Sequence, residues 1–223
     1  MILYLLYKEL FKLYKEGKNV VLKNSRIKKI NSLVETNFVG LYDVEYTNKL
    51  NQDKNWIVAS RKDKKELDEI YLNNKEDNID AVVISAFHKE SKKLVIIKQF
   101  RVPINNYIYE LPAGLVDGGE NIEETVSREL KEETGLNLLE INEESSNNKI
   151  YLSPGMTDES VAFVYCTCEG NISNEFLEDD EDIETILISQ EEARKILKGS
   201  EKIDVKAFLM LQIFASLGEK IFI

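Results

Sequence analysis

Apolar side chains recur every four positions within one strongly charged stretch, residues 114–136. The recurring residues are Ile122, Val126 and Leu130. This spacing places them on one face of an α-helix, and that face would be buried. Asn121 is a favoured N-cap residue, Glu124 completes a capping box, and Gly135 suits the left-handed position that ends a helix. The pattern therefore predicts a helix of about three to four turns between Asn121 and Gly135.

Several other segments are rich in apolar and β-branched residues, which predicts strands. Segment 79–87 is mostly apolar and is expected to form a central, buried strand. The polar segment 48–54 predicts a turn that joins its neighbours as antiparallel strands. The strands are expected at residues 20–30, 39–48, 55–61, 79–87, 92–101 and 160–170, with 107–111 leading into the charged stretch.

Both ends of the chain carry patterns that predict helices. Leucines line one side of residues 1–16, whose uninterrupted apolar run of seven residues is too short to span a bilayer. This segment also lacks the features of a signal peptide, so it is either a docked helix or one that contacts a membrane surface. Residues 62–78 are charged and predict a short helix or a loop. Residues 190–198 and 203–217 predict two further helices, the second almost wholly apolar.

Strands around one charged helix, with helices at the C-terminal end, indicate the α+β class and a sandwich of layers. The boundaries that follow are an N-terminal amphipathic helix at 1–19, a β-rich subdomain at 20–78 and the main domain at 79–223.

Charge and composition limit the partners. The 223 residues include 29 basic and 40 acidic side chains, a net charge of −11. We expect neither nucleic acid nor a membrane as partner, because both bind basic surfaces. A small phosphate ester remains compatible, since bound metal inverts the local field. Cys166 and Cys168 are expected to be reduced in a cytoplasmic protein, and His88, in a polar segment, is expected at the surface.

Three acids share a second face of the predicted helix. Glu129, Glu132 and Glu133 are spaced i, i+3 and i+4, so their like charges repel by roughly 0.2–0.5 kcal/mol per pair. Either the face is a solvated acidic surface, or a cation lies between the carboxylates. Carboxylate oxygens suit Mg²⁺ or Mn²⁺, whereas a softer metal would favour Cys or His.

The whole stretch is more specific than its acids, because it reads G-x5-E-x7-R-E-L-x-E-E-x-G-L. It resembles the signature of the Nudix hydrolases at every fixed position. The resemblance implies a Nudix-like α/β/α sandwich that binds divalent metal and cleaves a nucleoside diphosphate linked to another group. The fixed positions are Gly114, Glu120, Arg128, Glu129, Leu130, Glu132, Glu133, Gly135 and Leu136.

The resemblance also implies roles for single residues. More than one Mg²⁺, replaceable by Mn²⁺, is expected between Glu129, Glu133 and the pyrophosphate, with Glu132 and the Ala113 carbonyl as further ligands. Water would then attack one phosphorus in line. Arg128 is expected to pair with Glu120 and orient the helix. The positions with structural roles are Gly114, Glu120, Arg128 and Gly135.

The flanks are similar to the ADP-ribose pyrophosphatase branch of that family. The similarity lies in 97–101, 110–120 and 151–159, in an acidic segment before the C-terminal helices, and in the residues Trp56, Arg61, Arg101 and Glu110, which it implies bind substrate. Arg101 either binds phosphate or lies at the surface. Trp56 either packs in the core or stacks on adenine. In this branch the aromatic residue often comes from a partner subunit, which implies a homodimer.

The same resemblance implies that an acid from the segment 178–181 is the general base, with Glu181 or Glu178 as candidates; a solvated acidic loop is the alternative. The implied reaction is Mg²⁺-dependent hydrolysis of ADP-ribose, or of a related nucleoside diphosphate sugar, to AMP and ribose 5-phosphate. One alternative is a pyrophosphatase for another nucleotide sugar such as GDP-mannose. A second is a non-catalytic Nudix domain that senses ADP-ribose.

Overall fold

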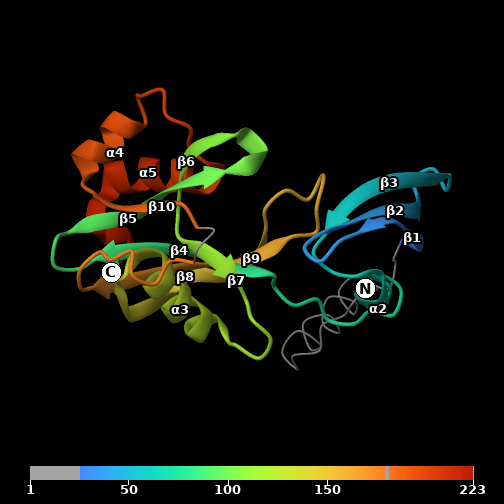
Figure 1. The fold of residues 1–223 in the computed structure, drawn as a ribbon. Coiled ribbons are helices and arrows are strands. Elements are labelled where there is room, and N and C mark those ends of the chain that lie inside the picture. The colour runs from blue at the N-terminus through green and yellow to red at the C-terminus, as the bar shows by residue number, and fades with distance from the viewer. Residues whose placement is uncertain (1–25, 179–180, 223) are drawn as a thin grey trace, which may run out of the picture. The chain divides into compact units, whose positions relative to one another are not determined.

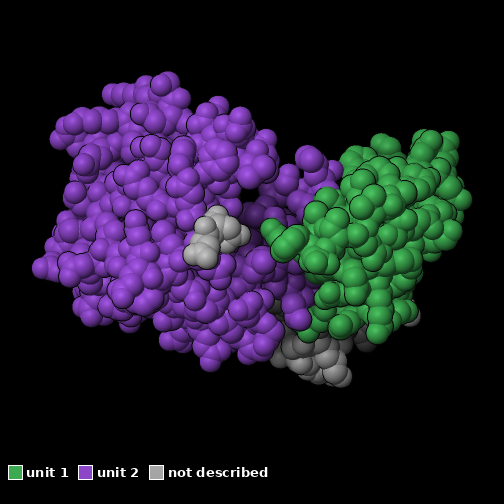
Figure 2. Space-filling model, viewed as in Figure 1, with its two compact units in different colours: residues 1–76 green, residues 77–223 purple. Residues whose placement is uncertain are grey.

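A computed structural model describes residues 26–178 and 181–222. The chain divides into two compact units, residues 1–76 and 77–223 (Figure 2). The helix predicted for residues 1–19 lies outside the described residues. Within the described ranges, no helix is long and apolar enough to cross a membrane.

The first unit is an antiparallel sheet with one helix packed on it (Figure 1). Ile30, Tyr42 and Val44 of the sheet are buried against Leu67 of the helix. The second and third strands are antiparallel neighbours joined through the polar turn, as predicted. The elements are β1 (Ile27–Glu35), β2 (Gly40–Thr47), β3 (Asp53–Ser60) and α2 (Lys64–Tyr71).

The first strand lies further along the chain than predicted. The expected range was 20–30, but β1 runs on to Glu35, and residues 20–25 lie outside the described part. The Thr36 hydroxyl accepts hydrogen bonds from the backbone N–H groups of Phe38 and Val39 in the turn that follows. The chain therefore reverses at once, and Glu35 pairs with Gly40. The end of β1 is therefore fixed by its pairing with β2 through this turn. The apolar pattern of the sequence does not show such pairing.

The second unit is built on a mixed sheet of seven strands with the order β10-β5-β4-β9-β8, with β6 added to β5 and β7 added to β4. The β4–β9 pair is parallel and the other pairs are antiparallel. β4 is central, and all eight of its residues are buried, as predicted for this segment. The strands are β4 (Ala81–His88), β5 (Lys93–Arg101), β6 (Asn106–Glu110), β7 (Ala113–Leu115), β8 (Asn137–Tyr151), β9 (Ser160–Glu169) and β10 (Ile183–Ile188).

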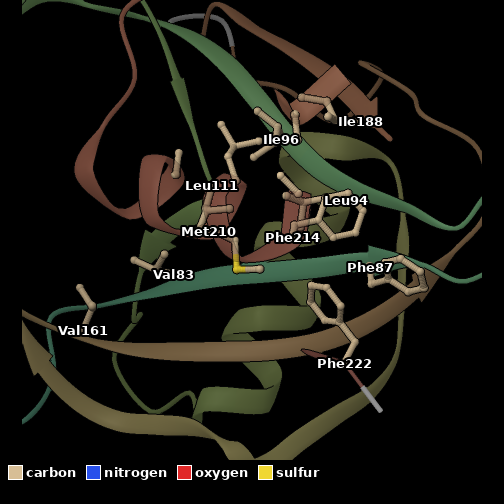
Figure 3. Packing of buried hydrophobic residues seen from close by; sticks show 14 of the residues in the cluster. Val83, Phe87, Leu94, Ile96, Leu111, Val161, Ile188, Met210, Phe214 and Phe222 are labelled. Atoms are coloured by element: carbon tan, nitrogen blue, oxygen red, sulfur yellow. The ribbon is translucent and has the colours of Figure 1, made fainter. Parts of the chain in front are cut away.

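Helices cover both faces of this sheet, which gives the three layers of the predicted α+β sandwich (Figure 1). Alternate residues of β4 point to opposite sides: Val83 and Phe87 pack with α5, whereas Val82 and Ile84 pack with α3. On the α5 side Phe87 stacks on Phe222 with ring centroids 5.1 Å apart (Figure 3). The helices are α3 (Ile122–Thr134), α4 (Gln190–Ile196) and α5 (Val205–Leu217).

The sheet divides between β4 and β5. These strands pair directly only next to their connecting turn, where Phe87 lies opposite Leu94. Beyond that point β4 pairs with β7, while β5 pairs with β6. The short segment from Glu110 to Ala113 crosses from one branch to the other. The end of α3 lies against this crossing, where the Ala113 N–H donates a hydrogen bond to the Glu133 carboxylate.

Two features differ from the sequence expectations. β8 occupies residues 137–151, which the apolar pattern did not mark as a strand. It lies at an edge of the sheet, so polar residues are tolerated, and its pairing with β9 shifts register at several points. His88 was expected at the surface but is 4% exposed, because it is the last residue of β4 and its ring bonds to Ser91 and the Gly170 carbonyl.

Candidate active site

α3 forms from the local signals that the sequence carries. The Asn121 side chain accepts a hydrogen bond from the Glu124 N–H at 3.0 Å, and the Glu124 carboxylate accepts one from the Asn121 N–H at 2.9 Å. Gly135 ends the helix with φ of 76°. Val126 and Leu130 are fully buried against the sheet. These contacts fix the rotation of α3, so its acidic face turns towards the divided edge of the sheet.

Arg128 holds the acids of this face together. Its Nε donates to Glu120 at 2.8 Å, and the guanidinium also donates to Glu129 at 2.7 Å and Glu132 at 3.0 Å. A further bond reaches the Leu115 carbonyl. Arg128 lowers the pKa of Glu120 to about 2. The expected Arg128–Glu120 pair is therefore present, and it ties the helix to the preceding loop.

Glu129 and Glu133 are buried carboxylates. They are 8% and 3% exposed, and burial is the main cause that raises the pKa of each. The charge of Glu181 raises both pKa values further. Glu133 Oε2 accepts a hydrogen bond from the Ala113 N–H at 3.0 Å, and the Glu133 carbonyl accepts one from Thr185 at 2.9 Å. Glu129 and Glu133 of α3, with Glu181 from the segment before β10, thus concentrate negative charge in one region.

A glycine makes room for one of these carboxylates. A Cβ atom at Gly114 would lie 1.8 Å from Cδ of Glu129, far closer than any real contact. Gly114 lies on β7, opposite Val82 of β4. The structural role implied for this position therefore has a physical reason, because the Glu129 carboxylate occupies the space that a side chain would fill.

Arg101 and Glu110 form a pair at the same division of the sheet. Arg101 Nε donates to Glu110 Oε2 at 2.8 Å, across neighbouring strands β5 and β6. Burial raises the pKa of Glu110, while Arg101 opposes that shift. The charge of Arg101 offsets part of the rise in the Glu133 pKa, so the Arg101 guanidinium lies within electrostatic reach of that carboxyl. The Arg101 guanidinium, close to these acids, is therefore suited to bind an anionic substrate next to them.

The remaining predicted residues are placed as follows. Glu181 Oε2 accepts a hydrogen bond from the Glu178 N–H at 2.9 Å, so the two candidates for the base contact each other. Trp56 lies on β3 and is 53% exposed, which excludes it from the core of the first unit. Arg61 follows β3 and is also exposed. Both belong to the first unit, and their part in substrate binding stays a prediction.

Similarity to known proteins identifies the family. The model of the NUDIX domain matches residues 77–208, which is more than half of the chain. The chain belongs to the NUDIX family. It is 35% identical over 134 residues to the ADP-ribose pyrophosphatase of Bacillus subtilis, across 59% of this chain and 70% of that protein. It is 30% identical over 145 residues to the GDP-mannose pyrophosphatase of an Enterobacter species, across 61% and 73%.

A solved structure shares the NUDIX fold described above. The crystal structure of an ADP compounds hydrolase aligns with a TM-score of 0.62 and 17% identity, covering 84% of this chain and 90% of that one. The predicted fold class is confirmed by this likeness. Members of the NUDIX family generally use divalent metal cations.

The carboxylates of Glu129, Glu132 and Glu133 are chemically suited to bind a divalent cation, and two of them, Glu129 and Glu133, are buried. Their oxygens are the hard ligands that Mg²⁺ and Mn²⁺ prefer, and their mutual repulsion favours a cation among them. In residues 26–178 and 181–222, no three such side chains converge on one point as they stand. Glu129 and Glu132 instead bind Arg128, and Glu133 binds the Ala113 N–H. A metal would therefore compete with Arg128 for two of these carboxylates.

Two further residues of the NUDIX site were not predicted from the sequence. Gln99 shares a face of β5 with Arg101, and its Oε1 is buried with no hydrogen-bond partner in the described part of the chain. Thr185 of β10 binds the end of α3. The alternation of β5 could have pointed to Gln99, because residues i and i+2 of a strand share a face. Nothing local marks Thr185, whose partner lies 52 residues away.

A large cavity of about 1390 Å³ lies elsewhere on the NUDIX unit. It lies between the loop around Gly118 and the irregular part of β8, and neither Glu129 nor Glu133 lines it. Its lining contains five acids and one base, Lys149, so its balance of charge is negative. A diphosphate would be repelled there, so this cavity is not the candidate active site.

Proposed function

We propose that this protein hydrolyses the pyrophosphate bond of ADP-ribose, or of a related nucleoside diphosphate sugar, to AMP and ribose 5-phosphate with Mg²⁺. The observation that carries the proposal is the burial of Glu129 and Glu133 on one face of α3, within electrostatic reach of Glu181, with the charge of Arg101 acting on Glu133. Acids that bind a cation, next to an arginine that binds phosphate, suit a diphosphate substrate. The names of the relatives support the substrate class.

The oxygens of Glu129 and Glu133, with Glu132 and the Ala113 carbonyl, would hold the cation. When bound, Mg²⁺ would neutralise phosphate charge and make a nearby water more acidic. Glu129 and Glu133 are buried, so their charges are poorly screened and act strongly at short range. Arg128 positions Glu129 and Glu132 through its hydrogen bonds and does not contact substrate in this proposal.

Glu181 is proposed as the general base rather than Glu178, because its charge reaches both buried acids. It would take a proton from the water whose oxygen attacks one phosphorus, while the bond from that phosphorus to the bridging oxygen breaks. Arg101, held by Glu110, would bind the phosphate oxygens and keep the attacked phosphorus in line. Gln99 Oε1 is available to accept a hydrogen bond from a substrate hydroxyl or a water.

The substrate proposal is tested with a panel of nucleoside diphosphate sugars in Mg²⁺. We expect kcat/KM for ADP-ribose to exceed that for GDP-mannose by about tenfold or more, on the scale of a few good contacts to the base. The similarity to a GDP-mannose pyrophosphatase keeps that sugar nucleotide as the second candidate. A clear preference for GDP-mannose would replace ADP-ribose as the substrate, and tight ADP-ribose binding without cleavage would favour a sensor.

We also infer that the protein is a homodimer formed through the first unit. Its sheet exposes Leu33, Val34, Leu41 and Ile57, and apolar groups of this kind favour burial by a second copy. In this inference Trp56, on β3 of the same sheet, would stack on adenine. Light scattering should give a mass near twice the 25.7 kDa of one chain. A mass near that of one chain would contradict the inference.

A further inference from the structure

An exposed tyrosine is tied to the residue that follows the proposed base. Tyr107 lies on β6 and is 42% exposed, yet its hydroxyl donates a hydrogen bond to the Asp182 carboxylate. Asp182 stands between Glu181 and the first residue of β10. Tyr107 belongs to none of the buried apolar clusters. Its hydroxyl therefore contributes little to the core, and its partner points to another role.

The backbone of Asp182 is held by the same pair of strands. The Phe100 N–H donates to the Asp182 carbonyl at 3.1 Å. Phe100 lies opposite Tyr107 in the β5–β6 pairing, and their rings meet edge to face with centroids 5.6 Å apart. The Lys98 ammonium lies 5.6 Å from the centre of the Tyr107 ring. Tyr107 is thus a fixed group on a paired strand, and it holds Asp182 by its side chain while Phe100 holds it by its backbone.

We propose that Tyr107 is a positioning residue, which fixes Asp182 and thereby holds the Glu181 carboxylate towards Glu129 and Glu133. Asp182 is anchored at two points, which restricts the backbone from which the neighbouring Glu181 side chain extends. Among the described residues, the Glu181 side chain itself is bound only to the Glu178 N–H. The catalytic consequence rests on the proposed function, whereas the anchoring is a property of the fold alone.

The anchoring is tested without substrate by amide hydrogen exchange. In Tyr107→Phe only the hydroxyl is lost, so exchange of the Phe100 amide and of the peptide containing Glu181 should become faster by about tenfold. Tyr109→Phe is the matched control on the same strand: its hydroxyl makes no hydrogen bond in the described residues, and exchange at these amides should not change. Unchanged exchange in Tyr107→Phe would overturn the anchoring, whatever the substrate proves to be.

The catalytic role is tested by kinetics with ADP-ribose and Mg²⁺. We expect Tyr107→Phe to lower kcat by about tenfold or more with KM changed by less than about twofold, because small displacements of catalytic groups are costly. Asp182→Ala should have the same effect, the double variant should be no worse, and Asp182→Asn should retain activity because it keeps an oxygen acceptor.

Kinetics of Tyr107→Phe in the Glu181→Gln variant test whether Tyr107 acts through Glu181. If Tyr107 acts through Glu181, adding Tyr107→Phe to Glu181→Gln should cause no further loss of kcat. A full additional tenfold loss there would contradict the positioning role, and so would wild-type kcat in Tyr107→Phe. Absence of cleavage by the unmodified protein would instead contradict the proposed function, while the exchange result would still decide the anchoring.

Discussion

Replacing Glu133 with Gln is expected to lower the turnover of ADP-ribose by about three orders of magnitude, with the fold intact. Glu133 is 3% exposed and lies between the Ala113 N–H and the charges of Glu129 and Glu181. The amide keeps the volume and an oxygen that can accept the Ala113 bond. It removes the negative charge, which is what a divalent cation requires. Steady-state kinetics with Mg²⁺ would measure the loss.

The same substitution is expected to stabilise the metal-free protein at neutral pH. The pKa of Glu133 is raised in the folded state, mainly by burial, so ionising this carboxyl opposes folding. Protonation of Glu133 stabilises the folded state fully below the ordinary pKa of about 4.5. This stabilisation is lost as the pH rises towards the pKa of Glu133 in the folded protein. In EDTA, Glu133→Gln should therefore match the parent near pH 4 and be the more stable protein near pH 8. Denaturant unfolding at both pH values would measure this difference.

Glu123→Gln is the matched control for both effects. Glu123 is an exposed acid in the first turn of the same helix, outside the candidate site. Removing its charge should leave kcat and the pH dependence of stability close to those of the parent. Near-normal turnover in Glu133→Gln would show that the assignment of this carboxylate to the metal is wrong.

Gly114→Ala is expected to lower kcat by about a hundredfold while changing the free energy of unfolding by about 1 kcal/mol or less. The new methyl group would lie 1.8 Å from Cδ of Glu129. The atoms in conflict are the end of a flexible side chain, so the fold can adjust by moving the carboxylate. That movement breaks the bond to Arg128 and displaces a proposed metal ligand. Kinetics and thermal unfolding of one preparation would measure both effects.

Gly118→Ala separates this effect from a general cost of losing glycine. Gly118 lies in the loop that follows β7, and a Cβ atom there would have nothing within 4 Å. Its kcat should stay within about twofold of the parent. If Gly114→Ala and Gly118→Ala had equal activities, the space that Gly114 leaves for Glu129 would have no catalytic importance.

The site could be predicted from sequence where its signals are local. Asn121 and Gly135 are within one helix length of each other, and both form the predicted caps. The Arg128–Glu120 contact also lies within this short stretch, which the family signature covers. Because all of these contacts are between residues close together in the chain, the sequence is enough to predict the bounds of the helix, its buried face and its acidic face.

Features that depend on distant pairing could not be predicted in this way. β8 is polar and is a strand because β9 offers it an edge. His88 is buried because its ring bonds to the Gly170 carbonyl, 82 residues away. The division between β4 and β5, which brings Arg101 towards the acids, results from which strands β6 and β7 join. Tyr107 and Asp182 meet for the same reason, 75 residues apart.

Identification of the products from ADP-ribose tests the central claim most directly. ADP-ribose is incubated with the protein and Mg²⁺, and the products are separated by anion-exchange chromatography and identified by phosphorus NMR. We predict AMP and ribose 5-phosphate in equal amounts, with no reaction in EDTA and almost none in Glu133→Gln. Intact ADP-ribose after prolonged incubation with Mg²⁺ or Mn²⁺, or release of ADP in place of AMP, would contradict cleavage of the pyrophosphate bond at this site.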